Sequence, residues 1–187
     1  EAINLVATTF GQQNIKKGDE ILITELEHHS NYVPWHYLRE TRGAIIKFAP
    51  INDDGDIIID ELKNLITSKT KIIAVTHLSN VTGTIVPIKE IVEIARKKNI
   101  PVLVDGCQST PHIKVDVKDL DCDFYAISCH KVYGPTGVGI LYAKKKWLEK
   151  LPPYIGGGGM ISEVKKDKIS YAPLPEKYEA GTMPTAE

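Results

Sequence analysis

The stretch from Lys71 to Asp105, KIIAVTHLSNVTGTIVPIKEIVEIARKKNIPVLVD, decides the fold. Its two ends, residues 71–76 and 101–105, are short apolar runs with the length and composition of buried strands. Between them, residues 87–98 carry apolar side chains at helical spacing, which gives a helix with one apolar face. This order predicts two parallel strands joined by a helix that crosses over the sheet.

The same alternation of strands and helices extends along the chain in both directions. Further apolar runs predict strands at residues 20–24, 44–48, 124–128 and 138–142. Helical patterns predict helices at residues 1–10, 34–41, 60–67 and 144–150. Asp60 is expected to be the N-cap of the helix that starts there. The chain is therefore expected to be an α/β protein with a mostly parallel sheet flanked by helices.

The composition and charge limit which partners and which cellular compartments are expected for this protein. The 187 residues are 42% hydrophobic and 25% charged with a net charge of -1, so neither nucleic acid nor an anionic membrane is an expected partner. No apolar run approaches the roughly 18 residues that cross a bilayer, and no signal peptide is expected at the start of the given sequence. Cys107, Cys122 and Cys129 lack CxxC spacing, which favours reduced thiols over a disulfide framework or a metal site. We expect a protein of the bacterial cytoplasm or an organelle that is not secreted.

Unusual polar residues gather directly after the predicted strands. They lie in residues 27–29, 77–80, 105–108 and 128–131. In an open parallel sheet, ligands bind beyond the carboxyl ends of the strands. The sequence therefore predicts one binding site to which all these stretches contribute.

Lys131 is the candidate nucleophile of this site. A lysine at a strand end that faces a cleft can attack an aldehyde. A solvated surface lysine is the alternative, and it is the usual state of a lysine taken alone. The neighbouring Ser128 and His130 favour the site, because both are residue types that bind phosphate.

Asp105 ends a buried apolar run, where a carboxylate is costly unless it is paired. A protonated pyridine nitrogen is a suitable partner, because the pairing makes the ring an electron sink. The N-cap of a helix starting near Gln108 is an equally good explanation. Gln108 and Asn80 are candidates to contact the phenolate oxygen of such a ring, and His28 is a candidate to stack on it. Asn80 could instead form the turn before Gly83.

Several blocks of sequence resemble a known family. Three resemble the class V aminotransferase superfamily of fold-type I pyridoxal-phosphate (PLP) enzymes: residues 105–108 (DGCQ), 121–125 (DCDFY) and 128–137 (SCHKVYGPTG). Others are similar to the SUF-type (group II) cysteine desulfurases, also called selenocysteine lyases: residues 25–31 (ELEHHSN), 33–35 (VPW), 77–83 (HLSNVTG) and 152–158 (PPYIGGG). The resemblance covers essentially the whole chain and implies the large domain of a type I PLP-dependent transferase.

The resemblance implies a role for each candidate residue. Lys131 would hold pyridoxal 5'-phosphate as a Schiff base and shuttle protons. His28 would stack over the pyridine ring and take part in acid–base steps. Asp105 would pair with the ring nitrogen, and Gln108 and Asn80 would contact the phenolate oxygen.

Phosphate binding and the reaction follow from the same resemblance. Ser128 and His130 would bind the cofactor phosphate, and Thr182 would reach the phosphate of the partner subunit in a homodimer. The reaction would convert L-cysteine, or L-selenocysteine, to L-alanine. The sulfur would remain on an enzyme cysteine as a persulfide and pass to an acceptor protein of iron–sulfur cluster assembly.

Two parts of the family pattern find no match in this chain. The nucleophilic cysteine and the arginine that binds the substrate carboxylate would lie beyond Glu187, in a C-terminal small domain. Residues 1–187 are therefore expected to be a central PLP-binding fragment, incomplete at both ends and inactive alone. Another class V enzyme, such as an aminotransferase or a kynureninase-like lyase, is an alternative. A non-catalytic module that binds a phosphate ligand or a protein partner is another.

Overall fold

The computed structural model describes residues 1–182 and divides into two compact units. The first is Glu1–Lys144, and the second begins at Lys145. Among the described residues, no helix is both long enough and apolar enough to cross a membrane. The expectation of one domain over residues 1–187 stays a prediction.

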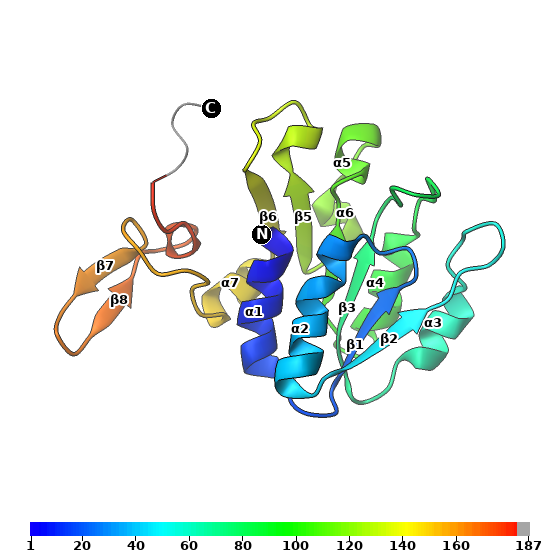
Figure 1. Ribbon diagram of the computed structural model, residues 1–187, viewed down its shortest axis with the longest axis horizontal. Helices are drawn as coiled ribbons and strands as arrows, with labels where there is room; N and C mark the ends of the chain where they lie inside the picture. The colour runs from blue at the N-terminus through cyan, green and yellow to red at the C-terminus, as the bar shows by residue number, and fades with distance from the viewer. Residues whose placement is uncertain (183–187) are drawn as a thin grey trace. The chain divides into compact units, whose positions relative to one another are not determined.

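The first unit is built on one six-stranded sheet (Figure 1). Its strands are β1 (Glu20–Thr24), β2 (Ile45–Ala49), β3 (Thr70–Thr76), β4 (Val102–Asp105), β5 (Phe124–Ser128) and β6 (Gly139–Ala143). They lie in the order β2-β1-β3-β4-β5-β6, and every neighbouring pair is parallel except β5 with β6. The expected mostly parallel α/β fold is confirmed.

Helices cover the sheet and bury its apolar side chains. They are α1 (Ala2–Asn14), α2 (Val33–Arg42), α3 (Ile59–Leu65), α4 (Ile88–Arg96), α5 (Ser109–His112) and α6 (Val117–Leu120). Figure 1 shows α1 and α2 side by side. Phe10 of α1 packs edge to face against Phe124 of β5, with 6.4 Å between the ring centroids. The apolar face of α4 is buried as predicted, with Ile91 fully covered in a core that includes Val75 and Val104.

The start of α3 corrects one expectation. Asp60 is not the N-cap; Ile58 holds that position, and the helix begins at Ile59. Ile57 is buried in the core, which fixes the chain just before the helix and sets the earlier start. Asp60 lies in the first turn instead, where its negative charge suits the helix dipole.

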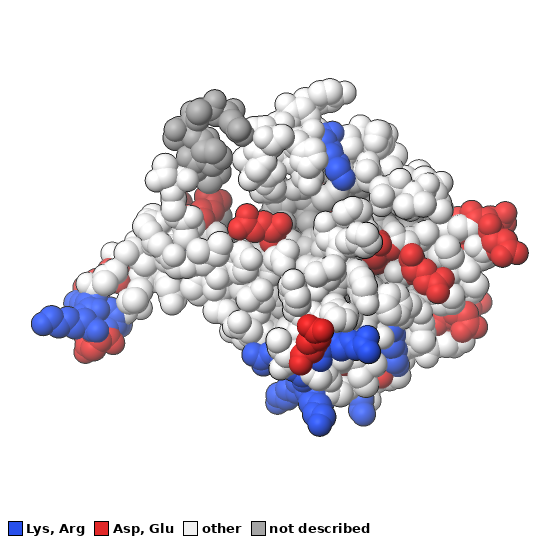
Figure 2. All heavy atoms as spheres, viewed as in Figure 1, with Lys and Arg blue, Asp and Glu red and all other residues white. Residues whose placement is uncertain are grey.

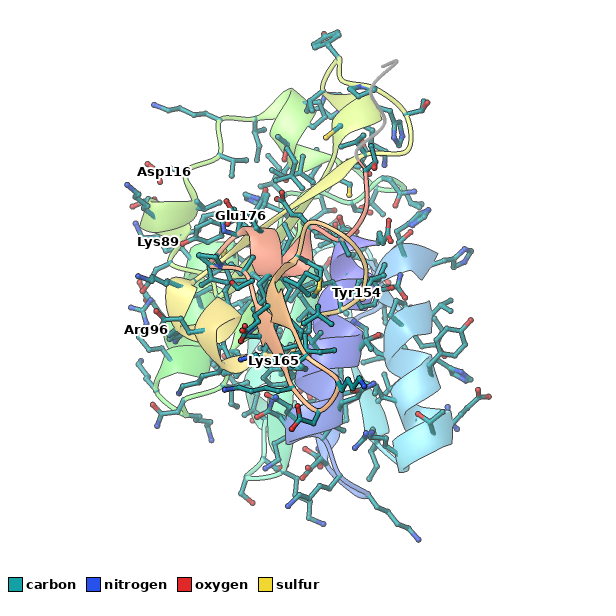
Figure 3. The ribbon with its side chains drawn as sticks, turned by 90° about the vertical axis from the view of Figure 1, so that its left-hand side faces the viewer. Lys89, Arg96, Asp116, Tyr154, Lys165 and Glu176 are labelled. Atoms are coloured by element: carbon teal, nitrogen blue, oxygen red, sulfur yellow. The ribbon has the colours of Figure 1, made fainter. Side chains whose placement is uncertain are left out.

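Exposed ion pairs connect α4 to the segment around α6. Lys89 Nζ lies 2.7 Å from an Asp119 carboxylate oxygen, and Arg96 pairs with Asp121. Figure 3 shows Lys89 and Arg96 on the same side of the molecule as Asp116, the N-cap of α6. Exposed pairs of this kind add little stability, so the buried face of α4 holds it in place.

The second unit contains a short helix and a hairpin. Its elements are α7 (Lys145–Lys150), β7 (Ile161–Val164), β8 (Ile169–Tyr171) and the 3-10 turn η3 (Glu176–Tyr178). The sequence did not predict the antiparallel β7–β8 hairpin, because charged residues interrupt its short apolar runs. Within this unit, the hydroxyl of Tyr178 donates toward the carbonyls of Leu148 and Leu151, each at 2.8 Å.

Candidate cofactor site

A cavity of about 280 Å³ opens beyond the carboxyl ends of β1, β3, β4 and β5. It is lined by His28, Ser30, Thr76, Leu78, Asn80, Asp105, Cys107, Gln108, Ser128, His130 and Lys131. Seven predicted site residues are therefore brought together from four separate stretches of sequence. The eighth, Thr182, lies in the second unit and is exposed. The roles of all eight stay predictions.

A larger hollow of about 600 Å³ lies along α1 and α2. Helix-surface side chains such as Gln12, Tyr37 and Arg42 line it, and no predicted site residue does. Figure 2 shows lysine and arginine side chains gathered toward the lower end of the molecule, where the chain turns from α1 into β1. The strand ends that carry the predicted chemistry lie at the opposite end.

Asp105 supplies a buried negative charge to the cavity. It is the last residue of β4 and is only 4% exposed. Its Oδ1 accepts a hydrogen bond from the backbone N–H of Cys107 at 3.0 Å. No ion pair reaches its carboxylate within the part of the chain that the structure describes. The N-cap explanation is wrong, because Gln108 occupies the N-cap position of α5.

A buried network of hydrogen bonds lies next to the segment that follows Asp105. The hydroxyl of Tyr125 lies 2.9 Å from Nδ1 of His77 and 2.6 Å from Oγ of Ser109. Burial raises the pKa of Tyr125 to about 12 and lowers the pKa of His77. Both rings are therefore neutral near pH 7. Sequence reasoning missed Tyr125 and Ser109, because nothing local to either residue indicates their contact.

His28 occupies the N-cap position of the 3-10 turn η1 (His29–Asn31). Its Nδ1 accepts the backbone N–H of Ser30 at 3.2 Å and lies 3.0 Å from the Ser30 hydroxyl. A backbone N–H can only donate, so Nδ1 is an acceptor and the neutral ring carries its proton on Nε2. The side chain is exposed at the cavity, and the ring centroid of His29 lies 5.7 Å away.

The 3-10 turn η2 (Cys129–Lys131) arranges the residues after β5. It places Ser128, His130 and Lys131 along the cavity while Cys129 stays buried, 8% exposed. The Lys131 side chain is half-buried, in contrast to the solvated surface lysine that was the alternative. The turn thus separates the polar residues of this stretch from its cysteine.

Cys107 is a lining residue that sequence reasoning passed over. Its Sγ donates to Oγ of Ser128 at 3.5 Å. Burial, with a contribution from the negative charge of Asp105, raises the pKa of its thiol to about 11. Cys107 lies inside the predicted stretch 105–108, and this position was the one indication in the sequence that it could line the site. No group of residues suited to a metal ion occurs among the described residues.

Residues 1–187 match the family described as aminotransferase class-V. The chain belongs to the class-V aminotransferase family. This confirms the resemblance seen in the sequence, and the family is PLP-dependent. The polar strand ends around the cavity thus lie in the chain of a PLP-enzyme family.

Individual relatives agree with this assignment. A cysteine desulfurase of Synechococcus elongatus is 50% identical over 182 residues, which are 97% of this chain and 29% of that protein. The solved cysteine desulfurase CsdA from Escherichia coli is 40% identical with a TM-score of 0.94, covering 98% of this chain and 46% of that chain. A variant of C-DES, solved with glycine covalently linked to its PLP cofactor, is 29% identical with a TM-score of 0.85, covering 97% and 48%. The chain spans less than half the length of each.

Proposed function

We propose that this class-V chain is the cofactor-binding part of a PLP-dependent cysteine desulfurase. The observation that carries the proposal is the single cavity that unites Lys131 with the buried carboxylate of Asp105. The reaction class is supported by relatives that are themselves named cysteine desulfurases. The substrate would be L-cysteine or L-selenocysteine, and the carbon product L-alanine.

The residues around the cavity fit PLP chemically. Asp105 is a buried carboxylate without a cationic partner among the described side chains, which suits a protonated pyridine nitrogen. Lys131 offers the amine that an aldehyde requires, and Ser128 and His130 offer phosphate donors. When bound, PLP supplies an electron sink for negative charge at the substrate α-carbon.

Proton handling would be divided between His28 and Lys131. Because Nδ1 of His28 is engaged by Ser30, its Nε2–H is the group left to donate in the neutral ring. Lys131 Nζ would take and return a proton at the substrate α-carbon. The side-chain amides of Gln108 and Asn80 would donate to the phenolate oxygen of the cofactor.

The sulfur would pass to a cysteine other than the three in this chain. Cys122 and Cys129 are buried, and the raised pKa of the Cys107 thiol keeps it protonated near pH 7. A protonated thiol is a weak nucleophile. The persulfide would then serve an acceptor protein of iron–sulfur assembly. In a homodimer, Thr182 would contact the phosphate of the partner subunit.

Cysteine turnover by the full-length protein tests the proposal. With PLP and L-cysteine it should produce L-alanine and, with a thiol reductant, sulfide. Lys131→Ala should abolish both products and the visible absorption band of bound PLP, whereas Lys118→Ala, a change at an exposed lysine of α6, should leave them intact. PLP binding without alanine formation would indicate another class-V reaction, and absence of PLP binding would refute the enzyme assignment.

A further inference from the structure

Glu27 precedes His28 and joins its own segment of the chain to β3, which is distant in sequence. Its Oε1 accepts the hydroxyl of Thr24 at 2.6 Å and the backbone N–H of Thr76 at 2.9 Å. Its Oε2 accepts the side-chain amide of Asn31 at 2.7 Å. The carboxylate thus connects the end of β1, the end of β3 and the turn η1.

The direction of these hydrogen bonds is determined by groups that can only donate. The indole Nε1–H of Trp35 donates to Oδ1 of Asn31 at 3.1 Å, so the amide nitrogen of Asn31 must face Glu27. Asn31 and Trp35 are both fully buried, which excludes water as a substitute. The Thr76 N–H likewise requires an acceptor, so both oxygens of Glu27 accept when its side chain is ionised.

The same contacts hold the chain both before and after His28. Glu27 is its chain neighbour, and the backbone N–H of Asn31 donates to the carbonyl of His28 at 2.8 Å. Fixing Asn31 therefore fixes the turn from which the imidazole projects. Thr76, the anchor on β3, pairs in register with Asp105 of β4. The carboxylate of Glu27 thus ties the turn of His28 to the strand ends that carry Asp105.

We infer that Glu27 is a positioning residue that fixes the imidazole of His28 relative to Asp105 at the cofactor cavity; this inference rests on the proposed function. A purely structural role is the competing explanation, since a buried carboxylate with three donors also stabilises a fold. The two explanations differ in one respect. Positioning acts through His28, whereas structural support does not depend on which side chain stands at position 28.

A double-mutant cycle in the full-length protein separates them. Glu27→Gln keeps the size of the side chain but turns one acceptor into an NH₂ donor. In either orientation of the amide, the NH₂ group then faces the donor of Asn31 or of Thr76, and one of these two loses its acceptor. In the parent protein, kcat for cysteine should fall roughly 10-fold with little change in KM, as expected for a lost hydrogen bond to a charged group. In the His28→Ala background, the same substitution should change kcat less than about 2-fold.

Glu25→Gln is the matched control. Glu25 lies two residues away, is exposed and accepts only a long 3.3 Å bond from the Ile51 N–H among the described contacts. It should leave kcat, KM and PLP affinity unchanged. If Glu27→Gln does not fold, Thr24→Val removes the 2.6 Å donor and should give the same pattern with a smaller loss.

PLP affinity of the apoprotein provides a second readout that needs no turnover. Glu27→Gln should weaken PLP binding in the parent but add less than about 2-fold to the effect of His28→Ala. Equal losses in both backgrounds would overturn the inference and leave Glu27 a structural residue. If the parent binds PLP without consuming cysteine, the proposed reaction fails, and the affinity cycle still decides the role of Glu27.

Discussion

Tyr125 fills the space beside Gly106 so closely that any side chain at position 106 would overlap its ring. A β-carbon built on Gly106 would lie 1.9 Å from Cε1 of Tyr125, well inside any permitted contact. The tyrosine cannot move away easily, because its hydroxyl contacts both His77 and Ser109. The contact therefore sets where the chain leaves β4, directly after Asp105.

Gly106→Ala is expected to destabilise the protein by about 3 kcal/mol or more, because the added methyl must displace a buried ring. It should also weaken PLP binding, since Asp105 is the adjacent residue. Chemical denaturation and PLP titration measure the two effects. Gly156→Ala is the control, because a β-carbon there meets no atom within 4 Å. Equal stability of the two variants would contradict the proposed packing.

Tyr125→Phe removes the hydroxyl while keeping the ring. It should cost about 1–3 kcal/mol of unfolding free energy, because buried polar atoms of His77 and Ser109 lose a partner. Tyr142 lies opposite Tyr125 on β6, and its hydroxyl forms no hydrogen bond within the described residues. Tyr142→Phe should therefore have little effect on urea denaturation, and a comparable loss would indicate that the network is not stabilising.

The Cys107 thiol should resist alkylation at pH 8. Its pKa is raised to about 11, chiefly by burial, so the reactive thiolate becomes common only above about pH 10. Peptide-resolved mass spectrometry after iodoacetamide treatment measures this directly. Cys107→Ala should retain cysteine turnover in the full-length protein. Rapid labelling at pH 8, or loss of turnover, would instead place Cys107 among the nucleophiles.

Glu27 should make stability depend on pH. Burial raises its pKa to about 7 from 4.5, against the hydrogen bonds from Thr24, Asn31 and Thr76, and the charge of Asp105 raises it further. Between these values the folded state holds a proton that the unfolded chain has released, so stability falls as pH rises from about 4.5 to about 7. Glu27→Gln should lack this contribution. Denaturation midpoints of both proteins that run parallel from pH 5 to pH 8 would refute the shift.

The strands of the sheet could be predicted because each is a short apolar run bounded by turn residues. All predicted strands occur in the structure, within two residues of their expected ends. The start of α3 was missed, since Asp60 is a good N-cap by type while the burial of Ile57 moves the helix start to Ile59. Capping preference is a local effect of about 1 kcal/mol, and core packing overrides it.

The candidate site could be predicted as a set of strand ends, because parallel strands place their carboxyl ends at one edge of the sheet. Lys131, Asp105 and His28 were identified in this way, and the structure places all of them around one cavity. Glu27 lies inside the predicted stretch 27–29 but was given no role there, and Tyr125 was not singled out. Their importance lies in contacts with residues 49 and 48 positions away along the chain, Thr76 and His77, which no local pattern records.

The amino-acid sequence by itself determined the alternation of strands and helices, the parallel sheet and the strand ends that carry the polar residues, because these follow from local periodicity and from the geometry of parallel sheets. Only the tertiary structure decided which polar groups are paired. It showed that Asp105 is buried without a cation among the described residues, that Cys107 lines the cavity with burial raising the pKa of its thiol, and that Glu27 and Asn31 hold the turn of His28. Hydrogen-bond direction and burial depend on the surrounding atoms in three dimensions, and therefore only the folded chain specifies them.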